Sequence, residues 1–254
     1  MTVSISAPSS AKPSWPVFET PLVGRELVAD RTMSFHFAKP DDWSYRAGQF
    51  IDITLIDPPE TDAEGNLRGF SISSAPREEV ITITTRLRDT AFKRSLQAVP
   101  LGTIVKVEGP FGDLRLHHAL RPAVLLAGGI GITPFRSILV ETLGAGSLPY
   151  PVAVFHANRR PEDAAFADEL RELARQDSNL TFVPTMTSMA GSGLAWDGEE
   201  GHIDAAMIDR HLDRTTSPIY YIAGPPGMVQ SLRGMLIGSG VEEDDVRIEE
   251  FTGY

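Results

Sequence analysis

The first half of the chain alternates apolar and polar residues with a period of two. The alternation is clearest in four short runs, Thr32–Ala38, Phe50–Ile56, Val80–Leu87 and Thr103–Glu108. Clusters of Pro, Gly and Asp separate several of these runs, and one helical stretch is predicted at Ala91–Ala98. Short strands with one buried face, divided by turns, are typical of antiparallel barrels and sandwiches. We therefore expect a six-stranded antiparallel barrel over residues 17–119.

From about Leu120 the pattern changes to continuous apolar runs that alternate with helical segments. An uninterrupted apolar strand such as Ala123–Ala127 is buried on both faces of a parallel sheet. This alternation predicts a five-stranded, doubly wound α/β domain over residues 120–254. The other predicted strands are Val152–Ala157, Leu180–Pro184, Ile219–Ala223 and Val246–Phe251, and the predicted helices are Pro134–Leu143, Pro161–Arg175 and Pro226–Gly238. Residues 187–201 are expected to form a surface loop, and residues 1–16 a disordered tail.

Composition removes several classes of function. The 254 residues include 23 Lys and Arg against 34 Asp and Glu, a formal net charge of −11, which argues against a nucleic-acid partner. The absence of cysteine excludes disulfides, cysteine-ligated iron–sulfur clusters and a cysteine nucleophile. No apolar run approaches the roughly 20 residues of a membrane helix, and no signal peptide is evident. We expect a cytoplasmic protein without a metal site.

A glycine turn follows the first parallel strand. Gly128, Gly129 and Gly131 precede Thr133 and Pro134, at the start of a predicted helix. Glycines bring bare N–H groups close to a ligand, and a helix N-terminus favours an anion such as a pyrophosphate. The G-x-G-x-x-G fingerprint is incomplete, because proline replaces the third glycine and no acid ends the next strand. A competing interpretation is a turn that only lets strand and helix pack closely.

That next strand runs instead into Asn158, Arg159 and Arg160, where the adenosine ribose of a dinucleotide would lie. Two guanidinium groups there would bind a 2′-phosphate and favour NADP over NAD. Glu162 and Asp163 follow at once and would neutralise them. The alternative is a solvated surface loop.

The segment Arg68–Ser74 (RGFSISS) is the second informative motif. It offers a cation for a phosphate, an aromatic ring for stacking, and hydroxyls for hydrogen bonds to a ring nitrogen. Ser71 does not fit a nucleophile elbow, since the G-x-S-x-G pattern fails at Ser73. A polar edge strand is the alternative interpretation.

These motifs, in this order, resemble those of the ferredoxin–NADP reductase superfamily over nearly the whole chain. The flavin motif R-x-[YF]-[ST]-x-x-S is matched by Arg68, Phe70, Ser71 and Ser74, and the nucleotide turn G-G-x-G-x-[TA]-P by Gly128, Gly129, Gly131, Thr133 and Pro134. The late C-G-P-x-x-M motif is matched by Gly224, Pro225 and Met228, with Ala223 in place of the cysteine. The resemblance implies that Arg68 meets a flavin phosphate, Phe70 lies along the isoalloxazine and Ser71 lies near its N5.

The resemblance also assigns roles outside the three motifs. Thr84, Thr85, Arg86 and Thr90 would line the flavin diphosphate, and Glu249 and Phe251 would lie near flavin and nicotinamide. Either Phe251 or Tyr254 would shield the flavin. The catalytic candidates are thus Ser71, Glu249 and Phe251. Ala223 removes a thiol that relatives place near the nicotinamide, and no cysteine-bearing cluster domain is present.

By this resemblance the chain is a flavin-dependent oxidoreductase that transfers hydride from NADPH or NADH to bound FAD. FAD is expected rather than FMN, and the electrons would pass to ferredoxin, flavodoxin, an oxygenase component or a small molecule. A patch of Arg86, Arg88, Lys93 and Arg94 is one candidate docking surface. Two alternatives stay open: a non-catalytic flavin- or nucleotide-binding redox sensor or scaffold subunit, and an NAD(P) dehydrogenase without flavin.

Overall fold

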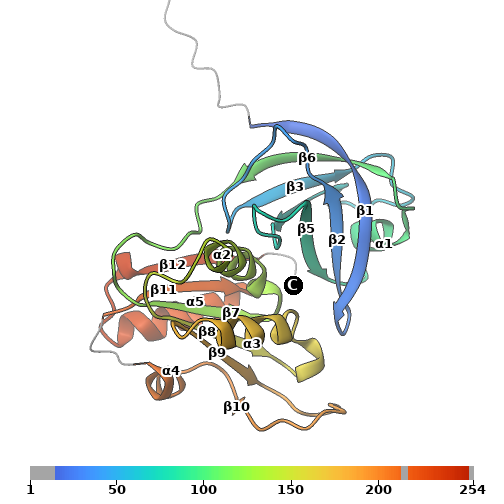
Figure 1. Ribbon diagram of the computed structural model, residues 1–254. Coiled ribbons are helices and arrows are strands. Elements are labelled where there is room, and N and C mark those ends of the chain that lie inside the picture. The colour runs from blue at the N-terminus through green and yellow to red at the C-terminus, as the bar shows by residue number, and fades with distance from the viewer. Residues whose placement is uncertain (1–14, 213–216, 252–254) are drawn as a thin grey trace, which may run out of the picture.

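A computed structural model describes residues 15–212 and 217–251. Figure 1 shows two bodies side by side, an antiparallel sheet built from the first half of the chain and a helix-flanked parallel sheet built from the second. The tail expected over residues 1–16 falls almost entirely outside the described residues, and so does Tyr254. The fold class inferred from the hydrophobic pattern is confirmed, with one difference in strand number given below.

The first body is a six-stranded antiparallel sheet in the order β4-β3-β6-β1-β2-β5. An isolated bridge between Ile72 and Ile83 joins the end of one edge strand to the other edge strand, so the sheet closes into a barrel. Alternate residues such as Phe35, Phe37 and Ile51 fill its interior, as the period of two predicts. The strands are β1 (Val17–Ala29), β2 (Thr32–Ala38), β3 (Phe50–Leu55), β4 (Leu67–Ser71), β5 (Val80–Arg86) and β6 (Ile104–Phe111), with helix α1 at Ala91–Ala98.

The second body is a parallel sheet of six strands in the order β10-β9-β8-β7-β11-β12, rather than the expected five. The added strand, Glu199–Glu200, lies in the segment that was expected to be a loop. It pairs with Thr185 and Met186 of the neighbouring strand. Two acidic residues carry no hydrophobic period, so nothing in the sequence signals a strand there. The strands are β7 (Ala123–Gly128), β8 (Val152–Asn158), β9 (Leu180–Met186), β10 (Glu199–Glu200), β11 (Ile219–Gly224) and β12 (Val246–Glu250).

Helices cover both faces of the parallel sheet. Leu125 of β7 packs in the cluster formed with α2 and α3, whereas its neighbours Val124 and Leu126 pack in the cluster formed with α4 and α5. Burial on both faces explains why β7 is apolar without a break. The helices are α2 (Ile132–Gly144), α3 (Ala167–Gln176), α4 (Ala205–His211) and α5 (Pro226–Gly238), with 3₁₀ turns η1 (Gly129–Gly131), η2 (Pro161–Asp163) and η4 (Glu243–Asp245).

The predicted helix Pro161–Arg175 is interrupted. A 3₁₀ turn occupies Pro161–Asp163, and α3 begins only after Phe166, whose φ of 61° lies in the left-handed region. The guanidinium of Arg136 lies 5.2 Å from the centre of the Phe166 ring. This tertiary contact accompanies a backbone conformation that local propensity disfavours for a bulky residue.

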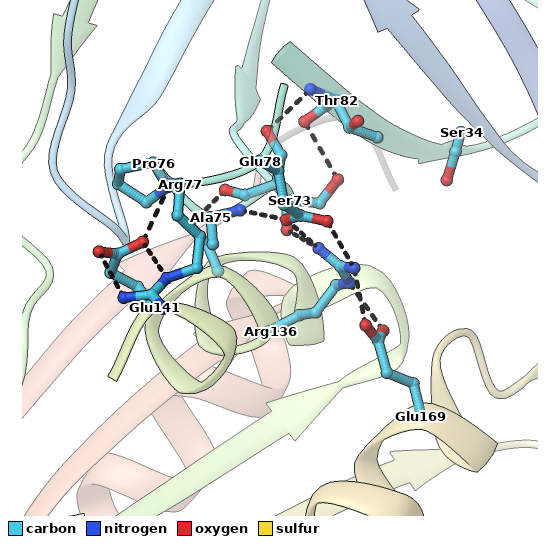
Figure 2. Close-up of polar contacts among 12 residues, drawn as sticks. Ser34, Ser73, Ala75, Pro76, Arg77, Glu78, Thr82, Arg136, Glu141 and Glu169 are labelled. Atoms are coloured by element: carbon cyan, nitrogen blue, oxygen red, sulfur yellow. Dashed lines mark hydrogen bonds and ion pairs between the residues drawn. The ribbon is translucent and has the colours of Figure 1, made fainter. Parts of the chain in front are cut away.

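Ion pairs and hydrogen bonds join the two bodies. Arg136 of α2 binds Glu78 from the barrel at 2.9 Å and Glu169 of α3 at 2.7 Å (Figure 2). The same guanidinium donates to the carbonyl of Ser73 at 2.8 Å, and the Ser137 hydroxyl donates to the carbonyl of Ser74 at 2.6 Å. The barrel is therefore fixed to α2 through the end of the RGFSISS segment.

Within the described parts of the chain, none of the helices combines the length and the apolar character needed to cross a bilayer.

Candidate functional site

The carboxyl ends of the parallel strands face the barrel (Figure 1). A cleft of about 990 Å³ is lined by residues of both bodies. In doubly wound sheets, ligands bind at this edge. The barrel side of the cleft comes from the β1–β2 turn and the end of β5, and the sheet side from the loops that follow β7, β8, β9 and β11. Among the predicted site residues, the lining includes Arg86, Thr90, Gly128, Gly129, Asn158, Arg159, Arg160, Pro225 and Met228.

The glycine turn packs against the loop after β11. A Cβ at Gly131 would lie 2.1 Å from the carbonyl oxygen of Ala223, and one at Gly128 would lie 2.4 Å from the Met228 sulfur. Gly129 has a φ of 50°. Close packing therefore accounts for Gly131, while Gly128 and Gly129 also line the cleft. The glycine turn is therefore in contact with the late motif at Ala223–Met228. Packing and ligand binding are compatible roles for the same turn.

The last two residues of that motif lie inside the protein. Thr133 is buried, and its hydroxyl donates to the carbonyl of Ile130 at 3.0 Å. Pro134 is buried in the first turn of α2, where proline suits the helix start. Gly224 ends β11 with a φ of 150° and approaches the backbone of Gly128. These three residues support the turn from the protein interior, and none of them lines the cleft.

Two polar side chains at the end of β8 are buried. The Nε2 of His156 lies 2.9 Å from the Gly129 carbonyl, which can only accept, so Nε2 carries the proton. Burial lowers the pKa of His156 to about 4, and the ring is neutral. Asn158 is 4 % exposed, and neither its amide nitrogen nor its amide oxygen has a hydrogen-bond partner among the described residues. Because such a group costs about 1–3 kcal/mol, its place in the cleft lining indicates a polar ligand.

The two arginines after Asn158 differ. Arg160 is bound by Asp163 and, from the barrel, by Asp30 at 2.8 Å. Arg159 is exposed at the cleft and makes no ion pair among the described residues. Of the two acids expected to neutralise the arginines, Asp163 pairs with Arg160 and Glu162 does not. Glu162 instead accepts hydrogen bonds from Ser192 and Gly193.

The predicted site residues at and after the end of β5 divide into those that line the cleft and those that do not. Arg86 lies in the cleft lining, donates to the carbonyl of Asp163 at 3.2 Å, and pairs with its carboxylate at 3.6 Å. Thr90 lines the cleft and caps α1. Thr84 is buried, and its hydroxyl is bonded to those of Ser34 and Ser73 at 2.8 and 2.9 Å. The structure thus directs the Thr84 hydroxyl into the barrel and away from the cleft lining.

The RGFSISS motif lies outside the cleft lining as well. Arg68 pairs with Glu64 at 2.8 Å and with Asp62 at 3.5 Å. Its guanidinium also lies 5.4 Å from the centre of the Phe92 ring, on which Phe70 packs. Ser74 is fully buried, and its hydroxyl is bonded to the Thr82 amide and the Tyr45 hydroxyl. The motif therefore supplies one cation and one ring near α1, and a buried structural hydroxyl.

The predicted docking patch is partly neutralised. Arg94 pairs with Glu60 and Asp89, and Arg86 with Asp163. Lys93 has no acidic partner among the described residues. Burial lowers the pKa of Lys93 to about 8, helped by the positive charges of Arg88 and Arg68. Of these cations, Arg88 lines the cleft, and its positive charge together with that of the nearby Lys93 suits a bound phosphate group.

A second contact joins the barrel to the parallel sheet at the edge strand β12. The Ser71 hydroxyl, at the end of β4, donates to Oε1 of Glu249 on β12 at 3.1 Å. Burial raises the pKa of Glu249 to about 7, and the Ser71 hydrogen bond opposes part of that rise. Glu249 is aligned with Ala223 across the β11–β12 pair, and the Phe251 amide donates to the carbonyl of Gly224 at 3.0 Å.

Three residues of the site and of the interface between the two bodies were not predicted from the sequence. His156 carries no motif and was visible only as a polar residue in an apolar strand. Asp30 and Arg136 act across the interface between the two bodies, and nothing local marks them. No cluster of acidic and histidine side chains able to hold a metal occurs among residues 15–212 and 217–251.

Comparisons with known proteins agree with this arrangement. Residues 125–234 match the family described as "Oxidoreductase NAD-binding domain". The chain is 28 % identical to a flavohemoprotein of Burkholderia sp. (strain TH2) over 91 % of this chain and 58 % of that protein. It is 28 % identical to ferredoxin–NADP reductase B of Sorangium cellulosum over 87 % of this chain and 91 % of the relative. The chain thus spans little more than half the length of several curated relatives.

Solved structures show the same fold. The FAD/NAD-binding domain of a Vibrio cholerae nitric oxide dioxygenase superposes with a TM-score of 0.78 at 23 % identity, covering 92 % of this chain and 98 % of that one. A ferredoxin NADP⁺ reductase from Neisseria gonorrhoeae, solved with FAD and NADP bound, gives 0.76 at 20 % identity, covering 92 % and 98 %.

Proposed function

We infer, from the membership of this chain in the ferredoxin–NADP reductase superfamily, that it is an NAD(P)H-dependent flavin oxidoreductase. The observation that carries the proposal is the shared cleft, to which the barrel contributes cations and the parallel sheet contributes the glycine turn and the unpartnered amide of Asn158. A flavin bound by residues 17–119 and a nicotinamide nucleotide bound by residues 120–254 would meet there.

The residues around α1 fit a flavin that carries phosphates. Lys93 and Arg68 bring positive charge, and Thr90 brings a hydroxyl at the start of the helix. We assign these three residues to the diphosphate of FAD, with Phe70 along the ring system. Thr84 and Ser74 contribute differently from the expectation, since their hydroxyls hold neighbouring strands inside the barrel.

The residues at the carboxyl edge fit a nicotinamide nucleotide. Gly128 and Gly129 line the cleft without side chains, and the adjoining 3₁₀ turn and helix α2 favour the diphosphate. The Asn158 amide, which has both a donor and an acceptor to satisfy, would bind a polar group of the nucleotide. Pro225 and Met228 supply the apolar side of the cleft.

A flavin held by these residues would supply the redox chemistry, namely hydride acceptance from nicotinamide and release of electrons singly or in pairs. Glu249 holds a proton on its carboxyl group near neutral pH, since its pKa is about 7. The Ser71 hydroxyl donates to Oε1 of Glu249 and orients the carboxyl group. Phe251, half-buried beside Gly224, would exclude water from this end of the site.

The class of electron acceptor is proposed from one relative and from the net charge of the chain. One relative is the reductase component of a propane 2-monooxygenase from Mycolicibacterium goodii, 26 % identical over 84 % of this chain and 61 % of that protein. We propose an oxygenase component, a ferredoxin, a flavodoxin or a small molecule as acceptor. The net charge of −11 opposes docking of a strongly acidic partner.

The test is an anaerobic titration of the purified protein, reconstituted with FAD, by NADH and then NADPH. Bleaching of the flavin bands supports the reductase. Flavin bands that persist with both nucleotides favour the sensor or scaffold alternative and make Ala223 the first residue to replace. Failure to bind FAD overturns the assignment. Lys93→Met should weaken FAD binding about tenfold, whereas Lys106→Met, an exposed barrel lysine, should not.

A further inference from the structure

We propose that Asp30 and Asp163 withhold Arg160 from the bound nucleotide, so that the cleft discriminates against a 2′-phosphate and accepts NADH in preference to NADPH. The proposal rests on the function proposed above and concerns the specificity of the same cleft. It assigns a specificity role to Asp30, a residue of the barrel that lies far in sequence from the residues beneath the nucleotide.

The donors of Arg160 are already engaged. Its Nε and Nη2 each lie 3.2 Å from a carboxylate oxygen of Asp163, and Nη2 also lies 2.8 Å from Oδ2 of Asp30. Its Nη1 donates to the carbonyl of Gly191 at 3.3 Å. A guanidinium binds phosphate through the same planar set of N–H groups, so a 2′-phosphate would have to displace these carboxylates.

Separating Arg160 from Asp163 is energetically unfavourable. Its side chain is 6 % exposed, and its only ion-pair partners among the described residues are Arg86 and Arg160. Burial opposes ionisation of Asp163, but the hydrogen bonds and charges of Arg160 and Arg86 outweigh it and keep the pKa low. Withdrawing a partner from a buried carboxylate is strongly unfavourable.

Asp30 is held in place by the backbone. It begins the turn between β1 and β2, and its amide donates to the carbonyl of Glu162 at 2.7 Å. The turn therefore stays on the η2 segment while the carboxylate reaches Arg160 across the cleft. Fixing the backbone lowers the entropy lost when the exposed ion pair forms, which makes this pair more persistent than a free surface pair.

The four charges in the ion-pair group around Arg160 therefore cancel. Arg86 and Arg160 face Asp163 and Asp30, which leaves Arg159 as the exposed cation of the Asn158–Arg160 segment. A 2′-phosphate placed beside Arg160 would meet two carboxylates and a guanidinium that they already bind, while Arg31, Arg88 and Arg159 line the cleft as well. A ribose with free hydroxyls meets no such repulsion and can donate hydrogen bonds to the carboxylates.

The experiment compares 5′-AMP with adenosine 2′,5′-bisphosphate, titrated into the purified full-length chain by calorimetry. The wild-type protein should bind 5′-AMP at least as tightly as the bisphosphate. Asp30→Asn should strengthen binding of the bisphosphate about tenfold and leave 5′-AMP within about twofold. Asp41→Asn removes the same charge from an exposed site on the barrel and should change neither.

A double variant assigns the gain to Arg160. In Asp30→Asn/Arg160→Gln the gain in bisphosphate affinity should disappear. The inference is overturned if the wild type binds the bisphosphate more tightly than 5′-AMP, or if the gain persists without Arg160. Asp30→Ser provides a second substitution should the first perturb the turn.

Kinetics separate this inference from the proposed function. NADH should reduce the reconstituted flavin more efficiently than NADPH, and Asp30→Asn should move the ratio of kcat/KM values toward NADPH. Reduction by both nucleotides with a ratio that Asp30→Asn leaves unchanged overturns the specificity role alone. Absence of any reduction and of any mononucleotide binding overturns the proposed function and the inference together.

Discussion

The hydroxyl of Ser71 lies 3.1 Å from Oε1 of Glu249, although 178 positions separate the two residues in the chain. Ser71 ends a barrel strand and Glu249 lies on the last strand of the parallel sheet, so the contact closes the junction between the two bodies. It also places a carboxyl group with a pKa of about 7 beside the motif assigned to flavin. Two predictions follow from this pair.

The first concerns proton transfer. In the reconstituted enzyme, the rate of flavin reduction or reoxidation should change around pH 7, and Glu249→Gln should flatten that profile and lower the rate about 10- to 100-fold. Ser71→Ala should move the transition to higher pH, because the Ser71 hydrogen bond lowers the pKa of Glu249. Stopped-flow measurements across pH 5–9 test this, with Ser239→Ala as an exposed control. A transition that survives in Glu249→Gln would contradict the assignment.

The second concerns stability. The pKa of Glu249 is about 7 in the folded state and near 4.5 when the group is unperturbed. Its contribution to stability is therefore complete below pH 4.5 and is lost as the pH rises to 7. Glu249→Gln removes this loss, so above pH 7 the variant should gain about 1–2 kcal/mol relative to wild type, allowing for partial solvent exposure. Urea denaturation at pH 5 and pH 8 measures the difference, and equal pH slopes for the two proteins would refute it.

The third prediction concerns the junction at Arg136. Its side chain is 13 % exposed and binds Glu78 and Glu169 from different elements. Arg136→Ala leaves two carboxylates facing each other in the interface, and should cost about 2–4 kcal/mol of unfolding free energy. Arg175→Ala, which removes one exposed pair on α3, should cost less than about 0.5 kcal/mol. Equal losses for the two variants in chemical denaturation would show that the network at Arg136 is not structural.

The fourth prediction contrasts two glycines. A Cβ at Gly131 would lie 2.1 Å from the Ala223 carbonyl, whereas one at Gly234 in α5 meets nothing within 4 Å. Gly131→Ala should therefore destabilise the fold by about 3 kcal/mol or more and weaken nucleotide binding. Gly234→Ala should stabilise it by about 0.5–1 kcal/mol, since alanine favours a helix interior. Thermal unfolding of both variants checks the sign of each change.

Most of the fold could be predicted from the sequence because most helices and strands carry a local sequence signal. β2, α1 and α5 were predicted at their observed bounds, since each carries a clear hydrophobic period or a marked start and end. The left-handed Phe166 and the short β10 were missed for the opposite reason. Each depends on contacts or pairing with residues distant in the chain, and neither has a local signal.

The candidate site divides along the same line. The residues themselves marked the glycine turn, the RGFSISS motif and Arg160 as candidates, because backbone freedom and side-chain chemistry belong to single residues, whereas Glu249 became a candidate only through the family resemblance. Only the tertiary structure decided that Thr84 turns into the barrel, that Asn158 is left without a partner, and that Asp30 reaches Arg160. Burial, pairing of charges and the resulting pKa shifts depend on which distant groups share a small volume, and no local pattern encodes that.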